Sequence, residues 1–355
     1  MKTEVGVSMA PKVLVHGSGA IGSIYAYLLL KAGCEVAAVC RSNYQVAKKA
    51  GFHISSALYG NDIHIQPTVV RSPDEAASTR QTFDYVLVCC KALPETHTAE
   101  IIAPVIVDGQ TAIVLIQNGI DIEKEYNDRF PNNTLVSCVA YLPVTQTSPG
   151  HISMGNMEKL EVGLCPSSDH EKLEARGSAE RLVELLRSAG GNAAYHDNIQ
   201  ERRWQKLLLN ASWNPMCALT MSRDVALLAS TATTEDPDFA EDTVRAVMNE
   251  VVEISQALGY TSVNREAAVR VMQIAKARVG GQGIEPSMLV DALEQRRMEV
   301  EVILGNPTRT ARRLGIAVPR LELLYMLSKA LDEANRWRQA GKSVGGEDLK
   351  RKDGT

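Results

Sequence analysis

Three polar side chains recur at four-residue intervals in the stretch KLLLNASWNP, residues 206–215. Lys206, Asn210 and Asn214 have the spacing that stacks side chains on one face of an α-helix. Leucines, alanine and tryptophan fill most of the other positions, as in a helix that packs into a core. An ammonium beside two carboxamides can bind and protonate a negatively charged oxygen, whereas on an exposed amphipathic helix the same residues form only a solvated ridge.

A glycine-rich turn follows the first apolar run, KVLV, and precedes a segment with helical periodicity. In the pattern G-x-G-x-x-G the glycines allow a tight turn and a close approach of the backbone to pyrophosphate, and the N–H groups of the following helix attract the anion. A tight turn alone does not need a strand before it and a helix and a second strand after it. We therefore expect this loop to bind a dinucleotide, through Gly17, Ser18, Gly19, Ala20, Ile21 and Gly22.

The end of the second strand indicates which dinucleotide binds. An NAD site usually places Asp or Glu about 20 residues after the glycine loop, where the carboxylate binds the ribose hydroxyls. Here the run VAAVC is followed by Arg41. A guanidinium suits the 2′-phosphate of NADP, which a carboxylate would repel. Arg41 therefore favours NADP (NADPH), and the alternative is an ordinary surface arginine.

Two more polar residues follow apolar runs typical of buried parallel strands. Lys91 comes after DYVLVCC, and Asn118 comes after TAIVLIQ. Taken singly, a lysine can be a solubilising edge residue, and Asn-Gly is a common turn. Ligands of a doubly wound sheet bind at the carboxyl ends of its strands, so we expect both residues to line the crevice of the glycine loop.

Strand and helix patterns alternate in the first half of the chain, and helical periodicity alone continues in the second half. This pattern predicts an α/β protein with an N-terminal Rossmann-type doubly wound sheet and a C-terminal all-helical domain. We expect the NADP-binding domain at residues 1–197, with 1–11 flexible, the helical substrate domain at 198–340 and a flexible tail at 341–355. Residues 151–165 are expected to add strands to the sheet.

The composition excludes several classes of partner. The 355 residues carry 38 Lys and Arg against 42 Asp and Glu, and no long basic tract is present, so nucleic acid and anionic membranes are not expected to bind. No apolar run approaches the roughly 20 residues that span a bilayer, and the N-terminal residues lack the apolar core of a secretory signal, which favours a cytoplasmic protein. The seven cysteines form no CxxC pair and are interpreted as reduced core residues. The histidines lack metal-site spacing, and no metal is expected.

The ordered set of motifs resembles the ketopantoate (2-dehydropantoate) 2-reductases, NADP-dependent enzymes with an N-terminal Rossmann domain and a C-terminal helical domain. The resemblance covers nearly the whole chain and rests on GSGAIG, CKAL, IQNG, WQKLLLNASWNP, PSML, and MEVEVILGN followed by GIAVP. It implies that Lys91 and Asn118 contact the cofactor near its reactive end.

The same resemblance implies a role for each polar residue of the helical half. Lys206 matches the family's proton donor, and Asn210 and Asn214 match its substrate-binding amides. Ser287 matches the hydroxyl that holds the substrate carboxylate. Glu299 matches the acidic residue near substrate and cofactor, which we count with Lys206 as catalytic.

The resemblance implies that the chain reduces ketopantoate to pantoate with NADPH, by hydride transfer with Lys206 as the proton donor. Where many members of the family read P-T-E-I-D, residues 297–301 read R-M-E-V-E. This departure leaves open another branched 2-oxo acid such as 2-ketoisovalerate. A third alternative is an NADP-binding sensor or interaction protein without turnover. The helical half could bury the face of a homodimer, or its amphipathic helices could only build a core.

Overall fold

The computed structural model describes residues 10–165, 172–232 and 234–339, and the chain forms two compact units. The first unit comprises Met1–Gln117 and Ile122–Ile199, and the second comprises Asn118–Asp121 and Gln200–Thr355. The flexible tail predicted at 341–355, and all but residues 10 and 11 of the flexible start, lie outside the described residues.

Within the described residues, the large sheet of the first unit has eight strands in the order β12-β11-β8-β7-β6-β1-β2-β5. Six neighbouring strands of this sheet, β5, β2, β1, β6, β7 and β8, are parallel. Their order across the sheet is the 3-2-1-4-5-6 order of dinucleotide-binding domains. This confirms the predicted Rossmann-type fold. The bounds of these strands are β1 Lys12–His16, β2 Glu35–Val39, β5 Thr68–Val70, β6 Tyr85–Val88, β7 Ala112–Leu115 and β8 Leu135–Tyr141.

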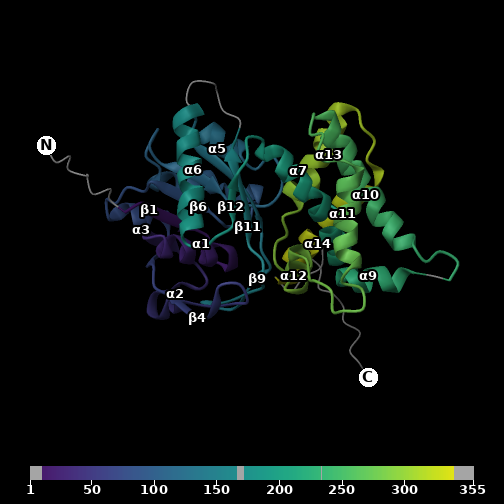
Figure 1. Ribbon diagram of the computed structural model, residues 1–355, viewed down its shortest axis with the longest axis horizontal. Coiled ribbons are helices and arrows are strands. Elements are labelled where there is room, and N and C mark those ends of the chain that lie inside the picture. Colours follow the sequence, from purple (N-terminus) through teal and green to yellow (C-terminus); the bar gives the residue numbers. More distant parts are fainter. Residues whose placement is uncertain (1–9, 166–171, 233, 340–355) are drawn as a thin grey trace. The chain divides into compact units, whose positions relative to one another are not determined.

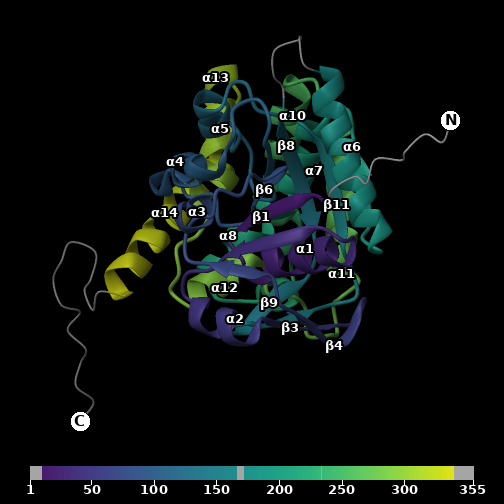
Figure 2. The ribbon, with the colours of Figure 1, turned by 90° about the vertical axis from the view of Figure 1, so that its left-hand side faces the viewer.

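Helices cover both faces of this sheet, which explains why its central strands are continuous apolar runs. All residues of β6 and β7 are buried, as expected for parallel strands between two helical layers. Figure 2 shows the strands with α1 and α6 on one side and α3, α4 and α5 on the other. The bounds of these helices are α1 Ala20–Lys31, α3 Pro73–Ser78, α4 Thr98–Ile102, α5 Lys124–Arg129 and α6 Lys172–Ser188.

A second, smaller sheet has the order β4-β3-β10-β9 and packs against α1. The helix α2 (Tyr44–Ala50) leads from β2 to this sheet. The prediction that residues 151–165 add strands to the large sheet is therefore correct for β11 (Lys159–Leu164), which pairs with β8, and wrong for β10, which pairs with β3 and β9. The remaining strands are β3 Phe52–Ser56, β4 Gly60–Ile65, β9 Val144–Ser148, β10 His151–Met154 and β12 Ala193–Tyr195.

The described part of the second unit contains helices and no strand, as predicted for the C-terminal half (Figure 1). Its two longest helices are α10 and α14. The helical elements are α7 Ile199–Asn210, α8 Trp213–Thr220, α9 Asp224–Thr231, α10 Phe239–Ala257, α11 Arg265–Lys276, α12 Ser287–Leu293, the π-helical turn η3 Glu301–Gly305, α13 Asn306–Leu314 and α14 Pro319–Gln339.

The stretch KLLLNASWNP does not form one helix, as its polar spacing had suggested. α7 ends at Asn210 and α8 begins at Trp213, with a turn between them. Pro215 explains the break because it has no N–H to donate and its ring would clash with the carbonyl of Ala211, four residues earlier. Lys206 and Asn210 therefore share one helix, and Asn214 belongs to the next.

The helical periodicity that was predicted for the second half is also interrupted after residue 293. After α12, Gln295 adopts a left-handed conformation with φ of 53°. The N–H of Gln295 donates to the carbonyl of Ala292 and that of Arg296 donates to the carbonyl of Asp291, at 3.1 and 2.7 Å. These two bonds form a Schellman motif, which ends the helix without the glycine that usually marks such a turn.

All seven cysteines are free thiols, five of them buried, in keeping with the prediction of reduced core residues. Among the described residues, no helix combines the length and the apolar character needed to cross a membrane.

Candidate functional site

Each glycine of the loop in the first unit meets a different steric demand. Gly17 has φ of 97°, and a Cβ there would lie 2.5 Å from the backbone nitrogen of Cys90. A Cβ on Gly22 would lie 2.4 Å from the carbonyl oxygen of Gly17, whereas one on Gly19 would meet no atom within 4 Å. The first and third glycines therefore permit close packing within the protein, and the second opens toward space that a ligand can occupy, as in dinucleotide-binding loops.

The loop also presents backbone N–H groups. Gly19 is the N-cap residue of α1 and has no side chain that could accept from the first N–H groups of the helix. The half-buried Ala20 and Ile21 begin its first turn. N–H groups in the first turn of a helix have no acceptor within the helix, so a bound phosphate would satisfy them. The hydroxyl of Ser18 instead donates to the carbonyl of Val15 at 3.2 Å. The Ser18 hydroxyl is thus bonded within the protein, and the contact of Ser18 with a cofactor stays a prediction.

A buried asparagine that the sequence analysis missed holds this loop. The Nδ2 of Asn43 donates to the carbonyl of Ser18 at 2.9 Å. The N–H of Ser18 donates to the carbonyl of Val39 at 3.3 Å. Asn43 lies two residues after Arg41, so the segment that carries the predicted phosphate ligand also fixes the loop.

Arg41 is exposed at the carboxyl end of β2. The neighbouring strand β1 ends at His16. Burial and the Arg41 guanidinium together lower the pKa of His16 to about 4. His16 is therefore neutral at pH 7 and adds no positive charge beside Arg41. Lys91 follows Cys90, whose backbone lies against Gly17, so the structure also brings the Lys91 segment to the loop.

The second unit joins three predicted residues by hydrogen bonds. Lys206 Nζ donates to Asn118 Oδ1 at 2.9 Å, and Asn118 Nδ2 donates to Glu299 Oε2 at 2.9 Å. Glu299 is buried and Lys206 is half-buried. Glu299 thus orients the carboxamide so that its oxygen faces the ammonium.

The segment Asn118–Asp121 is tied to the helices of this unit by its backbone. Buried Arg203 donates from its Nη1 to the carbonyl of Gly119 at 3.0 Å, and the Nδ2 of Asn306 donates to the carbonyl of Ile120 at 2.8 Å. Gly119 has φ of 89°, and a Cβ there would lie 2.4 Å from the Cβ of Val302. Glycine is thus required here by packing as well as by turn geometry.

The stretch that carries Glu299 is held by a residue far along the chain. Asp332 of α14 accepts from the N–H of Met298 at 2.7 Å and from the Nε of Arg297 at 2.9 Å. Helical spacing could have indicated Arg203, which precedes Lys206 by three residues, but the sequence carried no signal for Asp332.

The remaining predicted residues lie on elements next to this network. Asn210 and Asn214 are buried at the end of α7 and the start of α8. Ser287 is exposed in the first turn of α12, which packs against α8. The structure therefore places a hydroxyl and two carboxamides on connected elements of the second unit.

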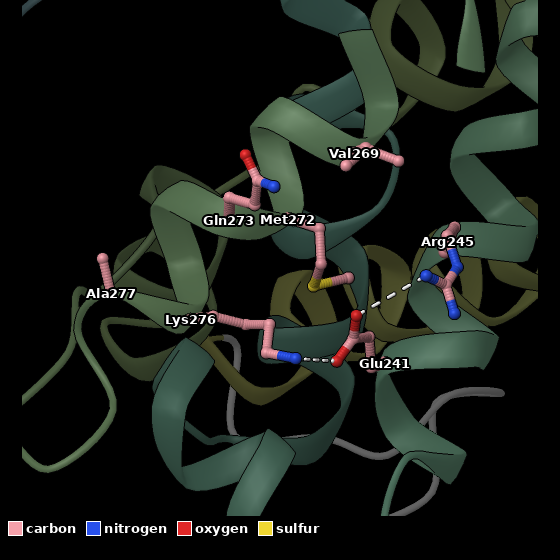
Figure 3. Close-up of a pocket in the computed structure, with 7 residues that line it drawn as sticks. All are labelled: Glu241, Arg245, Val269, Met272, Gln273, Lys276 and Ala277. Carbon is pink, nitrogen blue, oxygen red and sulfur yellow. Dashed lines mark hydrogen bonds and ion pairs between the residues drawn. The ribbon is translucent and has the colours of Figure 1, made fainter. Parts of the chain in front are cut away.

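A different hollow of the second unit, of about 300 Å³, contains none of the predicted residues (Figure 3). Its charged groups pair with each other, since Lys276 Nζ lies 2.6 Å and Arg245 Nη1 lies 3.6 Å from the carboxylate of Glu241. Among the described residues, no group of three or more His, Cys, Asp or Glu side chains could hold a metal ion.

Comparison with known proteins gives the same family along both units. The family model described as ketopantoate reductase PanE/ApbA matches residues 13–167, and that for its C-terminal part matches residues 198–332. The chain is 32% identical to an uncharacterised protein of Saccharomyces cerevisiae, over 89% of this chain and 92% of that one. The crystal structure of 2-dehydropantoate 2-reductase from Methylococcus capsulatus has a TM-score of 0.77 at 33% identity and covers 95% of this chain and 100% of its own.

A more distant structure shares only the fold. It is the ternary structure of D-mandelate dehydrogenase with NADH and anilino(oxo)acetate, which has a TM-score of 0.76 at 20% identity and covers 92% of this chain and 99% of its own. The Rossmann strand order, the glycine loop and the matches to both family models lead to one conclusion. The chain belongs to the ketopantoate reductase family.

Proposed function

We propose that this protein reduces 2-dehydropantoate to pantoate with NADPH. The observation that carries the proposal is the hydrogen-bonded series Lys206–Asn118–Glu299, because it holds an ammonium in a defined orientation beside a carboxamide. Bound NADPH would supply a hydride from its nicotinamide to the ketone carbon. As the hydride bonded to this carbon, the π electron pair of the C=O bond would move onto the oxygen, and the resulting alkoxide would take a proton from Lys206.

The protein's own residues divide the remaining tasks. Lys206 carries three N–H donors, one of which is directed at Asn118, and the ammonium also stabilises the charge that develops on the oxygen. Ser287 holds the substrate carboxylate, and Asn210 and Asn214 orient the substrate. Glu299 anchors Asn118 and accepts a hydrogen bond from the substrate hydroxyl.

The choice of NADPH rests on the first unit. Arg41 stands where an NAD-dependent site usually has an acidic residue, and among the described residues its guanidinium forms no ion pair. Gly19 leaves open space beside the helix N-terminus, so the loop fits a pyrophosphate. Lys91 supplies a further polar group at the end of β6.

The reading R-M-E-V-E changes less than the sequence suggested. Met298 and Val300 are both buried, so they contribute packing. The Glu301 carboxylate accepts from Lys329, Arg309 and Tyr325, at 2.7 to 2.9 Å. These contacts give the three positions structural roles, and the choice between ketopantoate and 2-ketoisovalerate is tested by kinetics. The homodimer remains a prediction.

The experiment is NADPH oxidation at 340 nm with ketopantoate and, at matched concentrations, with 2-ketoisovalerate, with NADH as the cofactor control. A site that pairs the substrate hydroxyl should reject the analogue that lacks it, by about 10⁴-fold or more in kcat/KM. Equal or better turnover of 2-ketoisovalerate would move the protein to another 2-oxo acid. NADPH binding without turnover of either acid would support the sensor alternative.

A further inference from the structure

A second arginine lies beside Arg41 at the edge of the sheet. β2 and β5 are parallel neighbours with Val39 opposite Val70, and the N–H of Cys40 donates to the carbonyl of Val70 at 2.9 Å. Arg41 follows Cys40, and Arg71 follows Val70. Both arginines are exposed at the carboxyl ends of their strands, the edge at which dinucleotides bind.

The guanidinium of Arg71 is ordered by an aromatic ring. Its Cζ lies 4.0 Å from the ring centroid of Tyr44, the buried first residue of α2. A guanidinium that lies over a ring keeps its in-plane N–H groups available at its edge, where they can bind a phosphate in a fork. Among the described residues, this guanidinium has no carboxylate partner.

The backbone of Arg71 is also fixed. Its N–H donates to the Oε2 of Glu75 at 2.7 Å, and the hydroxyl of Ser72 accepts from the N–H of Glu75 at 3.2 Å. These bonds anchor the start of α3, so Arg71 leaves the strand in a defined direction. The side chain and main chain are therefore both ordered before any ligand binds.

The local charge matches a dianion. Lys48 Nζ lies 2.6 Å from the hydroxyl of Tyr44, Arg71 lies over its ring, and the N–H of Tyr44 donates to the carbonyl of Arg41 at 3.2 Å. One carboxylate, that of Glu75, lies among these positive charges, because it accepts from the N–H of Arg71 and interacts electrostatically with Lys48. Three positive charges against one negative leave an excess of two, and a phosphate monoester carries a charge between about −1.5 and −2 at pH 7.

We propose that Arg71, held by Tyr44, is a second ligand of the 2′-phosphate of NADPH and determines the preference for NADPH together with Arg41. The inference rests on the proposed function only for the identity of the cofactor. Arg71 binds the phosphate directly, and Tyr44 is a positioning residue that acts through Arg71.

The test compares adenosine 2′,5′-bisphosphate with AMP, two ligands that differ only by the 2′-phosphate. Isothermal titration calorimetry on the full chain should show that the wild type binds the bisphosphate at least tenfold more tightly. Arg71→Ala should weaken the bisphosphate about 10- to 100-fold and leave AMP within about twofold. Arg71→Lys keeps the charge but loses the planar fork, so it should recover only part of the loss.

Two controls separate the contact from general charge and from folding. Lys49→Ala removes an exposed positive charge from the same helix and should leave both ligands within about twofold. Tyr44→Leu removes the ring under Arg71, so it should weaken the bisphosphate by less than Arg71→Ala does and leave AMP within about twofold. Melting temperatures of all variants report whether they fold.

An unchanged bisphosphate affinity in Arg71→Ala, or equal losses for both ligands, would overturn the role of Arg71. A wild type that does not distinguish the two ligands would overturn both arginine assignments. Neither ligand requires turnover, so a failure to reduce ketopantoate would refute the proposed substrate and leave the phosphate site intact.

Discussion

Removing the carboxamide of Asn118 should impair turnover through Lys206. In Asn118→Ala, Lys206 Nζ and Glu299 Oε2 each lose a hydrogen bond of 2.9 Å. A hydrogen bond to a charged group contributes about 1.5–3 kcal/mol. If the bond that orients the ammonium is lost in the transition state, kcat/KM falls by about 10- to 150-fold at 1.36 kcal/mol per factor of ten.

A double-mutant cycle tests whether Asn118 acts through Lys206. Lys206→Met removes the general acid and should lower kcat by about 10²–10⁴-fold. If Asn118 only positions Lys206, Asn118→Ala in this background should lower kcat by less than about threefold further, because the group that it orients is gone. Steady-state kinetics with ketopantoate give the four values, and Asn249→Ala, a half-buried asparagine of α10, is the matched control.

Two results would refute this reasoning. Losses that multiply in the double variant would mean that Asn118 and Lys206 act independently. A raised Kd for NADPH in Asn118→Ala, with kcat unchanged, would assign Asn118 to the cofactor alone, as the family resemblance also allows. Fluorescence titration with NADPH measures that Kd, and melting temperatures show whether the variants remain folded.

Three further predictions concern Arg41, the turn at Gly119 and the buried His16. Arg41→Asp should weaken NADPH binding by about 100-fold and change NADH binding little, because one charge-assisted contact with the 2′-phosphate becomes a repulsion. Equal losses for both cofactors would count against Arg41 as a ligand of that phosphate. Gly119→Ala should destabilise the protein by more than Gly259→Ala in denaturant unfolding, because both residues have φ near 90° but only the Cβ at Gly119 would strike Val302. The folded-state pKa of His16 lies below its unfolded value of about 6.5, so the unfolded chain binds more protons between pH 6.5 and 4 and stability is lost as the pH falls through that window. The loss in free energy of unfolding should approach about 3 kcal/mol at 1.36 kcal/mol per pKa unit. In His16→Asn the free energy of unfolding should depend less steeply on pH. An unchanged slope would show that other groups cause the pH dependence.

The parts of the fold that the sequence predicted have local causes. A strand buried on both faces requires a continuous apolar run, so the runs at residues 85–88 and 112–115 were recognisable without their neighbours. The glycine loop was recognisable for the same reason, since its turn and its close contacts demand glycine at Gly17 and Gly22. The strand order then follows from a small set of allowed connections.

The predictions that failed depended on signals that a periodic pattern hides. The end of α12 uses Gln295 in the left-handed conformation, so no glycine marked it. Pro215 marks the break before α8, but the four-residue spacing of the polar groups predicted one continuous helix. The stretch after α12 is held by Asp332, which lies more than thirty positions away, and no local pattern predicts such a partner.

Asn118 shows most clearly where local reasoning ends. It was selected because it follows a strand, yet its side chain and the next three residues belong to the second unit. Its partners Lys206 and Glu299 are 88 and 181 positions away. Only the folded chain shows that a strand end, a helix and an irregular stretch form one polar series. A carboxamide is suited to the middle of that series, because it can accept from an ammonium and donate to a carboxylate at the same time. Aspartate at this position would keep the acceptor and lose the donor, so the chemistry of the series itself selects asparagine.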